Sequence, residues 1–455
     1  MSLNDDINNL LKHKKIMFTT PSHDGTGFVI PGYENFLGRK FLSHDCSEYD
    51  GFDNLSSPGG IIKDAQCVCA EILGAENLFF LVNGSTSGII ASMLSCLKAD
   101  DKVLIARNCH KAVYNGLVLT GAKPCWIMPK LIEDWGIYGK ISPEAVHEAL
   151  NKYSKVKALI ITSPTYNGIV SDISKIADIC RKNGVILIVD EAHGALRQFL
   201  LADNILNAVT CGADISVQSL HKNCGAPNPC AILLRRKECS VSSSALQNAL
   251  NLVNTTSPSY PLIAASDACI RFLAAKKGNE KVRELYYNIK NFKDNLSEID
   301  GLNIFESGDF SKILLKIDNL NGYDLSEILY DDFNIEDELS NEKSVLFLCG
   351  IGTSGIKLSK LRKALVKIVQ RQEKSFREHT VFKFPLPEIR LVPQSAFGAK
   401  IKYIDIKKAL GKTCGELISE CPPEVPVLLP GEIIRQEHID YLQFKMKKTL
   451  IGIIG

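Results

Sequence analysis

The chain contains no run of 18 apolar residues, no internal repeat and no low-complexity tract. Without a long apolar run, a membrane-spanning helix is not expected. The 53 lysines and arginines are nearly balanced by 51 aspartates and glutamates. The resulting net charge of +2 gives no electrostatic reason to expect a nucleic acid or an anionic membrane as a partner. The composition is that of an ordinary soluble globular protein.

The cysteines also lack the spacing that is typical of metal ligands. The chain has 15 of them, but no Cys-x-x-Cys pair, so neither a zinc nor an iron–sulfur site is expected. The segment after Met1 includes Asp5 and Asp6 and has no apolar core of signal-peptide length. We therefore expect a cytoplasmic protein whose thiols are reduced and mostly buried.

Short apolar strands alternate with amphipathic helices between residues 60 and 260. The expected strands are 79–82, 103–106, 124–128, 158–162, 185–190, 215–217 and 230–234. The expected helices are 59–75, 89–97, 111–120, 142–150 and 172–183. Strands that are apolar throughout are typical of a parallel sheet covered on both faces, so the pattern predicts a large α/β domain.

The remainder of the chain predicts smaller units, since 455 residues exceed one compact core. One long helical stretch is expected over 263–300, strands over 312–317 and 345–348, and an extended proline-rich segment over 421–431. The predicted division is an N-terminal segment 1–59, a large domain 60–260, a small α+β domain 261–375 and a C-terminal domain 376–455.

Two expected strands of the large domain end in residues that pyridoxal-phosphate (PLP) chemistry requires. Strand 185–190 ends in Asp190, and the strand after Ala213 runs into Ser-x-His-Lys222. A lysine amine can bind the PLP aldehyde as a Schiff base, and a carboxylate can keep the pyridine nitrogen protonated, so that the ring draws electrons from the substrate Cα. A turn aspartate and a solvated loop would give the same pattern, so this pair alone leaves both interpretations open.

The segment Asn83-Gly-Ser-Thr-Ser-Gly88 lies between an expected strand and an expected helix. A helix N-terminus offers free N–H groups and positive potential, and glycine allows close approach, which together suit a phosphate. The alternative is a plain helix cap. Near the Asp190 and Lys222 pair the phosphate site is favoured, and Ser219 and His221 can reach the same group.

Further polar residues follow other strands of the large domain. His110 comes shortly after strand 103–106, where an α/β sheet binds its ligands, and its flat ring can stack on a pyridine. A surface histidine is the alternative. Hydroxyl clusters at 162–168 and 254–260 either join the site or cap turns.

In this order, the motifs resemble the Orn/Lys/Arg decarboxylase family of fold-type-I PLP enzymes, and in particular its short bacterial members without an N-terminal wing domain. The resemblance covers about Thr20 to Ile434. It rests on the segments 80–88, 107–111, 162–166, 189–194, 218–222, 256–258, 422–426 and 429–432.

The resemblance implies the PLP-dependent decarboxylation of ornithine, lysine or arginine to the amine and CO2, as in polyamine biosynthesis. It implies that Lys222 is the Schiff-base lysine, that Asp190 pairs with the ring nitrogen, and that His110 and Ala192 cover the two faces of the ring. The phosphate would be surrounded by Ser85, Thr86, Ser87, Ser219 and His221. The resemblance also implies that Thr256 and Ser257 reach the cofactor of the neighbouring subunit, which makes the protein a homodimer with shared sites.

Four segments differ from the usual family pattern. Thr20-Pro-Ser-His-Asp24 has Ser and Asp where the family has Gly and Lys, and Phe52-Asp-Asn-Leu55 replaces Leu-Asp-Asp-Leu. Residues 223–229 replace Thr-Leu-Pro-Ala-Leu-Thr-Gln, and Pro393-Gln-Ser-Ala-Phe397 lacks an arginine. The residues implied for the cofactor are therefore kept, whereas those on the substrate side differ.

Two other hypotheses therefore stay open at this point. One is a PLP-dependent aminotransferase or lyase acting on another amino acid, because the fold allows different bonds to be broken. The other is a PLP-binding regulator without catalysis, which the retention of Lys222 and Asp190 disfavours. The sequence leaves open the amino acid that is accepted and any assembly beyond a dimer.

Overall fold

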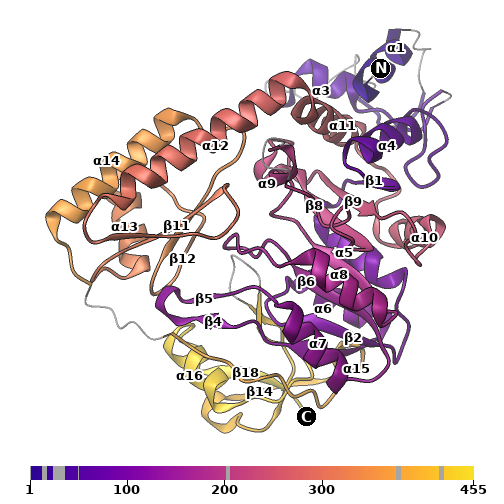
Figure 1. Cartoon of the computed structure of the whole chain (residues 1–455). Coiled ribbons are helices and arrows are strands. Elements are labelled where there is room, and N and C mark those ends of the chain that lie inside the picture. The colour runs from indigo at the N-terminus through magenta and orange to yellow at the C-terminus, as the bar shows by residue number, and fades with distance from the viewer. Residues whose placement is uncertain are drawn as a thin grey trace.

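The computed structural model of the chain describes residues 2–12, 18–23, 36–49, 51–200, 205–375, 381–419 and 425–455. Its centre is a seven-stranded sheet with the order β1-β9-β8-β7-β6-β2-β3 (Figure 1). The strands are β1 (Asn77–Leu81), β2 (Lys102–Ala106), β3 (Lys123–Ile127), β6 (Val156–Thr162), β7 (Ile186–Asp190), β8 (Ile215–Ser219) and β9 (Ala231–Arg235).

All neighbouring strands in this sheet are parallel except β9, which runs antiparallel to both β1 and β8. The predicted, mostly parallel α/β sheet is thus confirmed. Since the other strands share one direction, their carboxyl ends meet at a single edge of the sheet, which is where open α/β sheets bind ligands.

Alternate residues of each strand enter two different cores. Ile105 and Ile188 pack in the core on one face of the sheet, while their neighbours Leu104 and Leu187 pack in the core on the other face. Because a strand side chain points to opposite faces at successive positions, a strand buried on both sides must be apolar at every position. This explains the continuous apolar runs.

Helices cover both faces of the sheet. One face carries α5 (Gly84–Leu94), α6 (Lys111–Thr120) and α10 (Ser243–Val253). The other face carries α4 (Ile61–Ile72), α7 (Pro143–Lys152) and α8 (Ile173–Lys182). Short elements complete this part, namely β4 (Leu131–Ile132), η1 (Glu133–Trp135), β5 (Ile137–Tyr138), η2 (Arg197–Phe199) and α9 (Leu220–Asn223).

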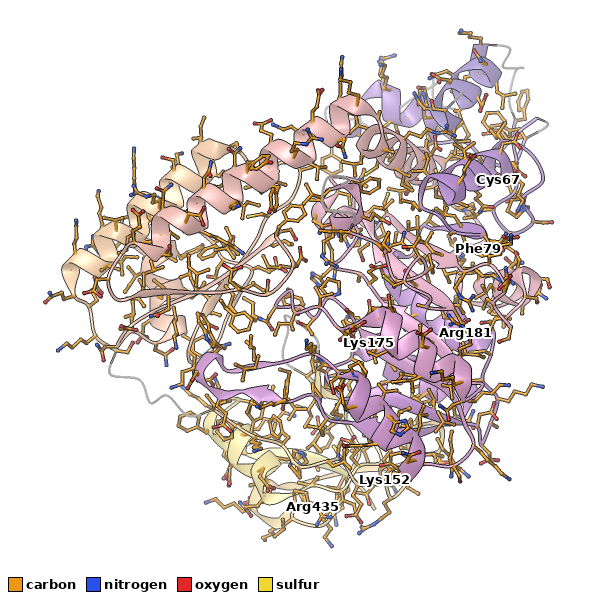
Figure 2. All side chains as sticks on the ribbon, viewed as in Figure 1. Cys67, Phe79, Lys152, Lys175, Arg181 and Arg435 are labelled. Atoms are coloured by element: carbon orange, nitrogen blue, oxygen red, sulfur yellow. The ribbon has the colours of Figure 1, made fainter. Side chains whose placement is uncertain are left out.

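Helix α8 illustrates why these segments fold as they do. Ile176 and Cys180 are buried against the sheet, whereas Lys175 and Arg181 point outward to solvent (Figure 2). Apolar residues at this spacing form one stripe of a helix. The Asp172 side chain accepts a hydrogen bond from the backbone N–H of Lys175 and caps the first turn. Among the described residues, no helix is long and apolar enough to cross a bilayer.

The predicted single helical stretch over 263–300 is wrong. Two helices, α11 (Tyr260–Ala274) and α12 (Lys276–Ser297), are separated by Ala275 in an extended conformation. A Cβ atom at Gly278 would lie 1.8 Å from the backbone oxygen of Phe272. Only glycine permits so close an approach of the first turn of α12 to the end of α11.

The small sheet has the strand order β10-β11-β13-β12 and is antiparallel throughout. Its strands are β10 (Leu302–Phe305), β11 (Lys312–Ile317), β12 (Leu339–Ser340) and β13 (Val345–Leu348). It is accompanied by α13 (Gly322–Phe333) and α14 (Gly355–Arg371), and α14 lies alongside α12 (Figure 1). The strands expected at 312–317 and 345–348 are confirmed.

The described C-terminal residues form a three-stranded sheet, a two-stranded sheet, two α-helices and one 3₁₀-helix, and they have a small core of their own. These elements are α15 (Pro393–Ala396), β14 (Ile401–Asp405), η4 (Ile406–Lys408), β15 (Thr413–Cys414), β16 (Ile418–Ser419), β17 (Pro426–Leu428), α16 (Gln436–Phe444) and β18 (Leu450–Ile454). The proline-rich segment is extended in β17, while residues 420–424 lie outside the described part.

The N-terminal helices α1 (Leu3–Lys12) and α3 (Arg39–His44) pack near α11. The fully buried Asp267 accepts hydrogen bonds from the N–H of Leu3 at 2.9 Å, the Cys69 thiol at 3.3 Å and Arg271 Nε at 2.7 Å. One carboxylate therefore joins α1, α4 and α11. The predicted division of the chain into four parts stays a prediction.

Candidate functional site

A cavity of about 410 Å³ opens at the carboxyl edge of the central sheet. Its volume falls within the range of roughly 300–1,000 Å³ that small-molecule sites occupy. Eight of the residues singled out from the sequence line it, namely Ser85, Thr86, His110, Asp190, Ala192, Ser219, His221 and Lys222. They come from the ends of β1, β2, β7 and β8, so the parallel sheet brings together residues far apart in sequence.

The first turn of α5 forms one end of the cavity. The helix begins at Gly84 rather than near Ile89, so Ser85 and Thr86 belong to its N-terminal turn. Gly84 has φ 73°, a left-handed conformation that favours glycine. The Ser85 hydroxyl is hydrogen-bonded to the Ser219 hydroxyl at the end of β8. Helix N–H groups and two joined hydroxyls make this end suitable for an anion.

Asp190 is the last residue of β7 and is buried. Its Oδ1 accepts a hydrogen bond of 3.1 Å from the backbone N–H of Ala192, which fixes the carboxylate at the cavity wall. The next carboxylate, Glu191, instead lies within the protein, where it accepts hydrogen bonds from Ser216 and Gln218. Burial raises the pKa of Glu191, and its role is structural.

His110 is the N-cap residue of α6. Its Nδ1 accepts a hydrogen bond of 3.1 Å from the N–H of Ala112, so the ring is held at the cavity wall by its own helix. A flat ring fixed in this way can stack on a planar ligand.

Lys222 lies in the short helix α9, immediately after β8. The preceding His221 is oriented by a 2.9 Å hydrogen bond between its Nδ1 and the backbone oxygen of Cys230. Burial lowers the pKa of His221. The chain thus leaves the sheet edge with a hydroxyl, an imidazole and an amine directed at one space.

The sequence analysis assigned no role to His193, which contacts Lys222, or to Lys312, which contacts His193. His193 Nε2 lies 2.7 Å from Lys222 Nζ, and His193 Nδ1 lies 2.9 Å from the Nζ of the fully buried Lys312. Burial, together with Lys312 and Lys222, holds the pKa of His193 well below its usual range. The sequence of β11 carries two lysines, Lys312 and Lys316, among apolar residues, so it gave no signal that Lys312 is the buried one.

Three residues implied for the cofactor do not line this cavity. The Ser87 hydroxyl donates to the backbone oxygen of Gly84 and is buried within α5. Thr256 and Ser257 are exposed on the surface of the chain. The roles assigned to these three residues stay predictions.

The four segments that differ from the family pattern do not all lie at the cavity. Asn228 and Pro229 line the cavity, whereas α15, which contains Gln394, packs against α6. Both carboxylate oxygens of Asp53 accept backbone hydrogen bonds, including one of 2.8 Å from Gly60 at the start of α4. Asp24 lies outside the described residues.

Two buried polar atoms of the cavity lining lack a hydrogen-bond partner within the described part of the chain. They are Asn108 Oδ1 and Thr162 Oγ1. Because buried polar atoms are nearly always hydrogen-bonded, such atoms indicate that the cavity holds a polar ligand. An amine, a carboxylate, a flat ring and an anion site around one cavity fit PLP.

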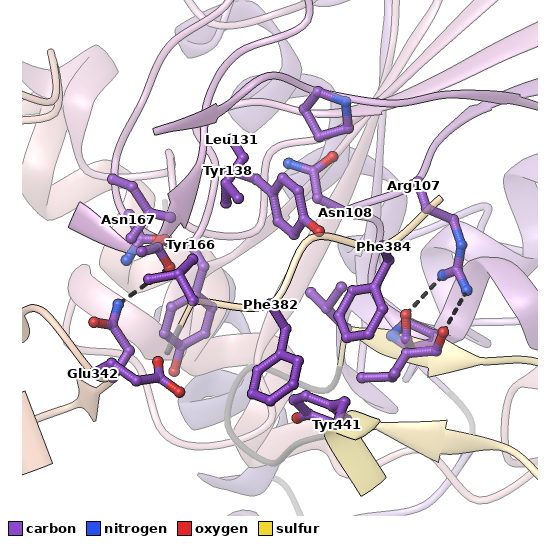
Figure 3. A pocket seen from close by; sticks show the side chains of 18 of the residues that line it. Arg107, Asn108, Leu131, Tyr138, Tyr166, Asn167, Glu342, Phe382, Phe384 and Tyr441 are labelled. Atoms are coloured by element: carbon purple, nitrogen blue, oxygen red, sulfur yellow. Dashed lines mark hydrogen bonds between the residues drawn. The ribbon is translucent and has the colours of Figure 1, made fainter. Parts of the chain in front are cut away.

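A second cavity, of about 190 Å³, adjoins the first, and Asn108, Tyr166 and Val425 line both. Aromatic rings surround it, among them Phe382, Phe384 and Tyr441, which lie together in Figure 3. The Tyr166 hydroxyl donates to the carboxylate of Glu338. The residues that line this cavity come from the part around the central sheet, from the small sheet and from the C-terminal part, for example Tyr138, Leu339 and Phe382.

Arg107, which directly follows β2, binds the C-terminal part through an ion pair and two hydrogen bonds. Its Nη2 lies 3.1 Å from Glu432 Oε2, and Nη1 and Nη2 donate to the backbone oxygens of Pro426 and Val427. Both charged side chains are buried. Burial raises the pKa of Glu432, while Arg107 opposes that rise. This contact places Val425 next to both cavities.

Comparison with known proteins gives one consistent result. Residues 3–313 match the Orn/Lys/Arg decarboxylase major domain, and residues 372–449 match the Orn/Lys/Arg decarboxylase C-terminal domain. The arginine decarboxylase of Bacillus subtilis is 33% identical over 452 residues, which is 95% of this chain and 91% of that protein. The arginine decarboxylase of Halalkalibacterium halodurans is 32% identical, covering 95% of this chain and 90% of that protein.

Solved structures show the same fold. The lysine decarboxylase of Francisella novicida superimposes with a TM-score of 0.85 at 20% sequence identity, covering 100% of this chain and 81% of that one. At this identity the likeness concerns the fold alone. It confirms the predicted fold-type-I architecture.

Proposed function

The chain belongs to the Orn/Lys/Arg decarboxylase family and decarboxylates a basic amino acid, and we propose that it does so with PLP bound through Lys222. The observation that carries this proposal is the position of Lys222 in one cavity with Asp190, His110 and the N-terminal turn of α5. An amine that can bind an aldehyde thus lies beside a carboxylate, a planar ring and an anion site.

Each residue has a separate task in this proposal. Asp190 holds a proton on the ring nitrogen, and the hydrogen bond from Ala192 keeps its carboxylate in place. His110 covers one face of the ring and Ala192 the other. Ser85, Thr86, Ser219 and His221 would surround the phosphate, with the hydroxyls of the three hydroxyl-bearing residues and the N–H groups of the first turn of α5 as the donors to its oxygens.

When bound, PLP supplies the electron sink that allows the bond between Cα and the carboxylate to break. The residues around the site would determine which bond breaks through the orientation in which they hold the substrate. Tyr166 and Asn108, which line both cavities, would lie beside the substrate.

We propose arginine as the preferred substrate. The relatives from Bacillus subtilis and Halalkalibacterium halodurans are named arginine decarboxylases. In addition, the second cavity continues past Tyr166 and is lined by Phe382, Phe384 and Tyr441. Aromatic faces attract a guanidinium group by stacking and by cation–π interaction. A side chain as long as that of arginine would extend into this space.

We also propose a homodimer with shared sites. Thr256 and Ser257 are exposed and lie in an irregular segment before α11. Because these two hydroxyls are exposed and do not line the cavity of their own chain, they could contact the cofactor phosphate bound by a partner subunit.

The experiment is to load the protein with PLP, add arginine, lysine or ornithine separately, and identify the products by mass spectrometry. The expected result is the corresponding amine, formed fastest from arginine. A product that retains the carboxylate would favour an aminotransferase or lyase. Uptake of PLP without any product would favour a regulator.

A further inference from the structure

Three nitrogen-bearing side chains form a continuous row behind the cofactor lysine. Lys222 Nζ, the two ring nitrogens of His193 and Lys312 Nζ are joined by contacts of 2.7 Å and 2.9 Å. The rings of His193 and Tyr166 also meet at an angle of 61°, with their centroids 4.5 Å apart. Lys312 comes from β11 of the small sheet, so the row links that sheet to the central one.

The row cannot hold two ammonium groups. A neutral imidazole has one N–H donor and one acceptor lone pair. If Lys312 is an ammonium group that donates to His193 Nδ1, then Nε2 carries the hydrogen and donates to Lys222, which must accept with an amine lone pair. The reverse arrangement requires a neutral Lys312. In both arrangements one lysine is neutral.

Two carboxylates, Asp309 and Glu338, lie near Lys312, whereas Asp190 lines the cavity that Lys222 also lines. Asp309 and Glu338 face Lys312 and stabilise its ammonium form, while Lys222 disfavours it and burial lowers its pKa to about 8. Cys349 also lies near Lys312. On the other side, His193 faces His110 and His221 as well as the two lysines.

We propose that Lys312, acting through His193, keeps the Lys222 amine neutral and therefore ready to bind the cofactor aldehyde. Lys312 is thus a positioning residue, and the inference rests on the proposed role of Lys222. Condensation of a neutral amine with an aldehyde forms one C=N bond. It releases one water, made of the aldehyde oxygen and the two amine hydrogens, so no other reactant is required.

The test measures Lys222 itself in the cofactor-free protein. Acetic anhydride acetylates neutral amines, so acetylation of each lysine across a pH series, read by mass spectrometry, gives the midpoint pH at which that amine becomes reactive. In the wild type, Lys222 is expected to reach its midpoint at a lower pH than exposed lysines of the same sample. A midpoint equal to or above theirs would overturn the proposal, whether or not any variant folds.

The variant Lys312→Met removes the ammonium group while nearly preserving the length of the side chain. His193 is then able to accept from a protonated Lys222, and the repelling charge is gone. The midpoint of Lys222 is expected to rise by about one pH unit. Lys312→Gln should cause the same rise, and Lys312→Arg, which keeps the charge, should restore a midpoint near that of the wild type.

The matched control is Lys316→Met, the same substitution four residues further along β11. Lys316 donates to the backbone oxygen of Asp134 at 3.1 Å and lies over the ring of Trp135, so the midpoint of Lys222 should not move. An unchanged midpoint in Lys312→Met or Lys312→Gln, with the fold verified by circular dichroism, would overturn the inference and leave the proposed function intact. A wild-type protein that does not take up PLP would overturn the proposed function.

Discussion

The hydroxyl of Ser85 is hydrogen-bonded to the hydroxyl of Ser219, although 134 residues separate them. Ser85 belongs to the first turn of α5, and Ser219 ends β8, three residues before Lys222. The contact therefore sets the distance between the proposed phosphate site and the proposed cofactor lysine. A ligand held by both would have to span that distance.

Removing either hydroxyl should weaken the binding of PLP. We expect Ser85→Ala and Ser219→Ala each to lower the affinity by about tenfold, because a hydrogen bond to a charged phosphate is worth roughly 1.5 kcal/mol or more. The double variant should lose less than the sum, since the two hydroxyls act together. Fluorescence titration of the cofactor-free protein measures the affinities. The control is Ser95→Ala near the end of α5; an equal loss there would contradict the phosphate assignment.

Asp190→Asn should retain bound PLP and lose most of its turnover, by ~100-fold or more. An amide has the shape of the carboxylate but cannot hold the proton on the ring nitrogen. Absorbance of the bound cofactor and the rate of amine formation would be compared in the same preparation. Asp172→Asn, which keeps a good cap on α8, serves as the control for the change of carboxylate to amide. Wild-type turnover in Asp190→Asn would refute the role.

Lys312 should make stability depend on pH between about 8 and 10.5. Its pKa is lowered from 10.5 to about 8 by burial in the folded protein. Below pH 8 the lysine is protonated in both states and its burial costs stability. Between the two values the unfolded chain binds more protons, so the free energy of unfolding rises with pH. Between pH 8 and 10.5, the free energy of unfolding of the wild type should therefore increase by up to about 3 kcal/mol relative to that of Lys312→Met. Urea unfolding at several pH values would measure it, and parallel curves for the two proteins would disprove it.

The central sheet was predictable because strands buried on both faces must be apolar throughout. The residues proposed for the cofactor follow the ends of those strands, and the parallel arrangement gathers Ser85, His110, Asp190 and Lys222 at one edge. Lys312 was not predictable in this way, because its contact with His193 depends on how the small sheet packs against the large domain. The break between α11 and α12 was missed because Gly278 acts through a close approach to Phe272, which the helical periodicity does not reveal.

Dilution should release the cofactor if Thr256 and Ser257 reach the phosphate held by the partner subunit. Sedimentation velocity at decreasing concentrations would follow the dimer, and the absorbance of bound PLP would be recorded in the same cell. We expect the two signals to fall together. A monomer that keeps its PLP would show that the site is complete within one chain.

The most direct test of the account uses arginine labelled at its carboxyl carbon, with wild-type protein and Lys222→Ala compared in the presence of PLP. The account predicts that the wild type releases the label as CO2 and leaves the decarboxylated amine, and that Lys222→Ala releases none. If the wild type left the label in every product from arginine, lysine and ornithine, or if Lys222→Ala released it at the wild-type rate, the account would be contradicted.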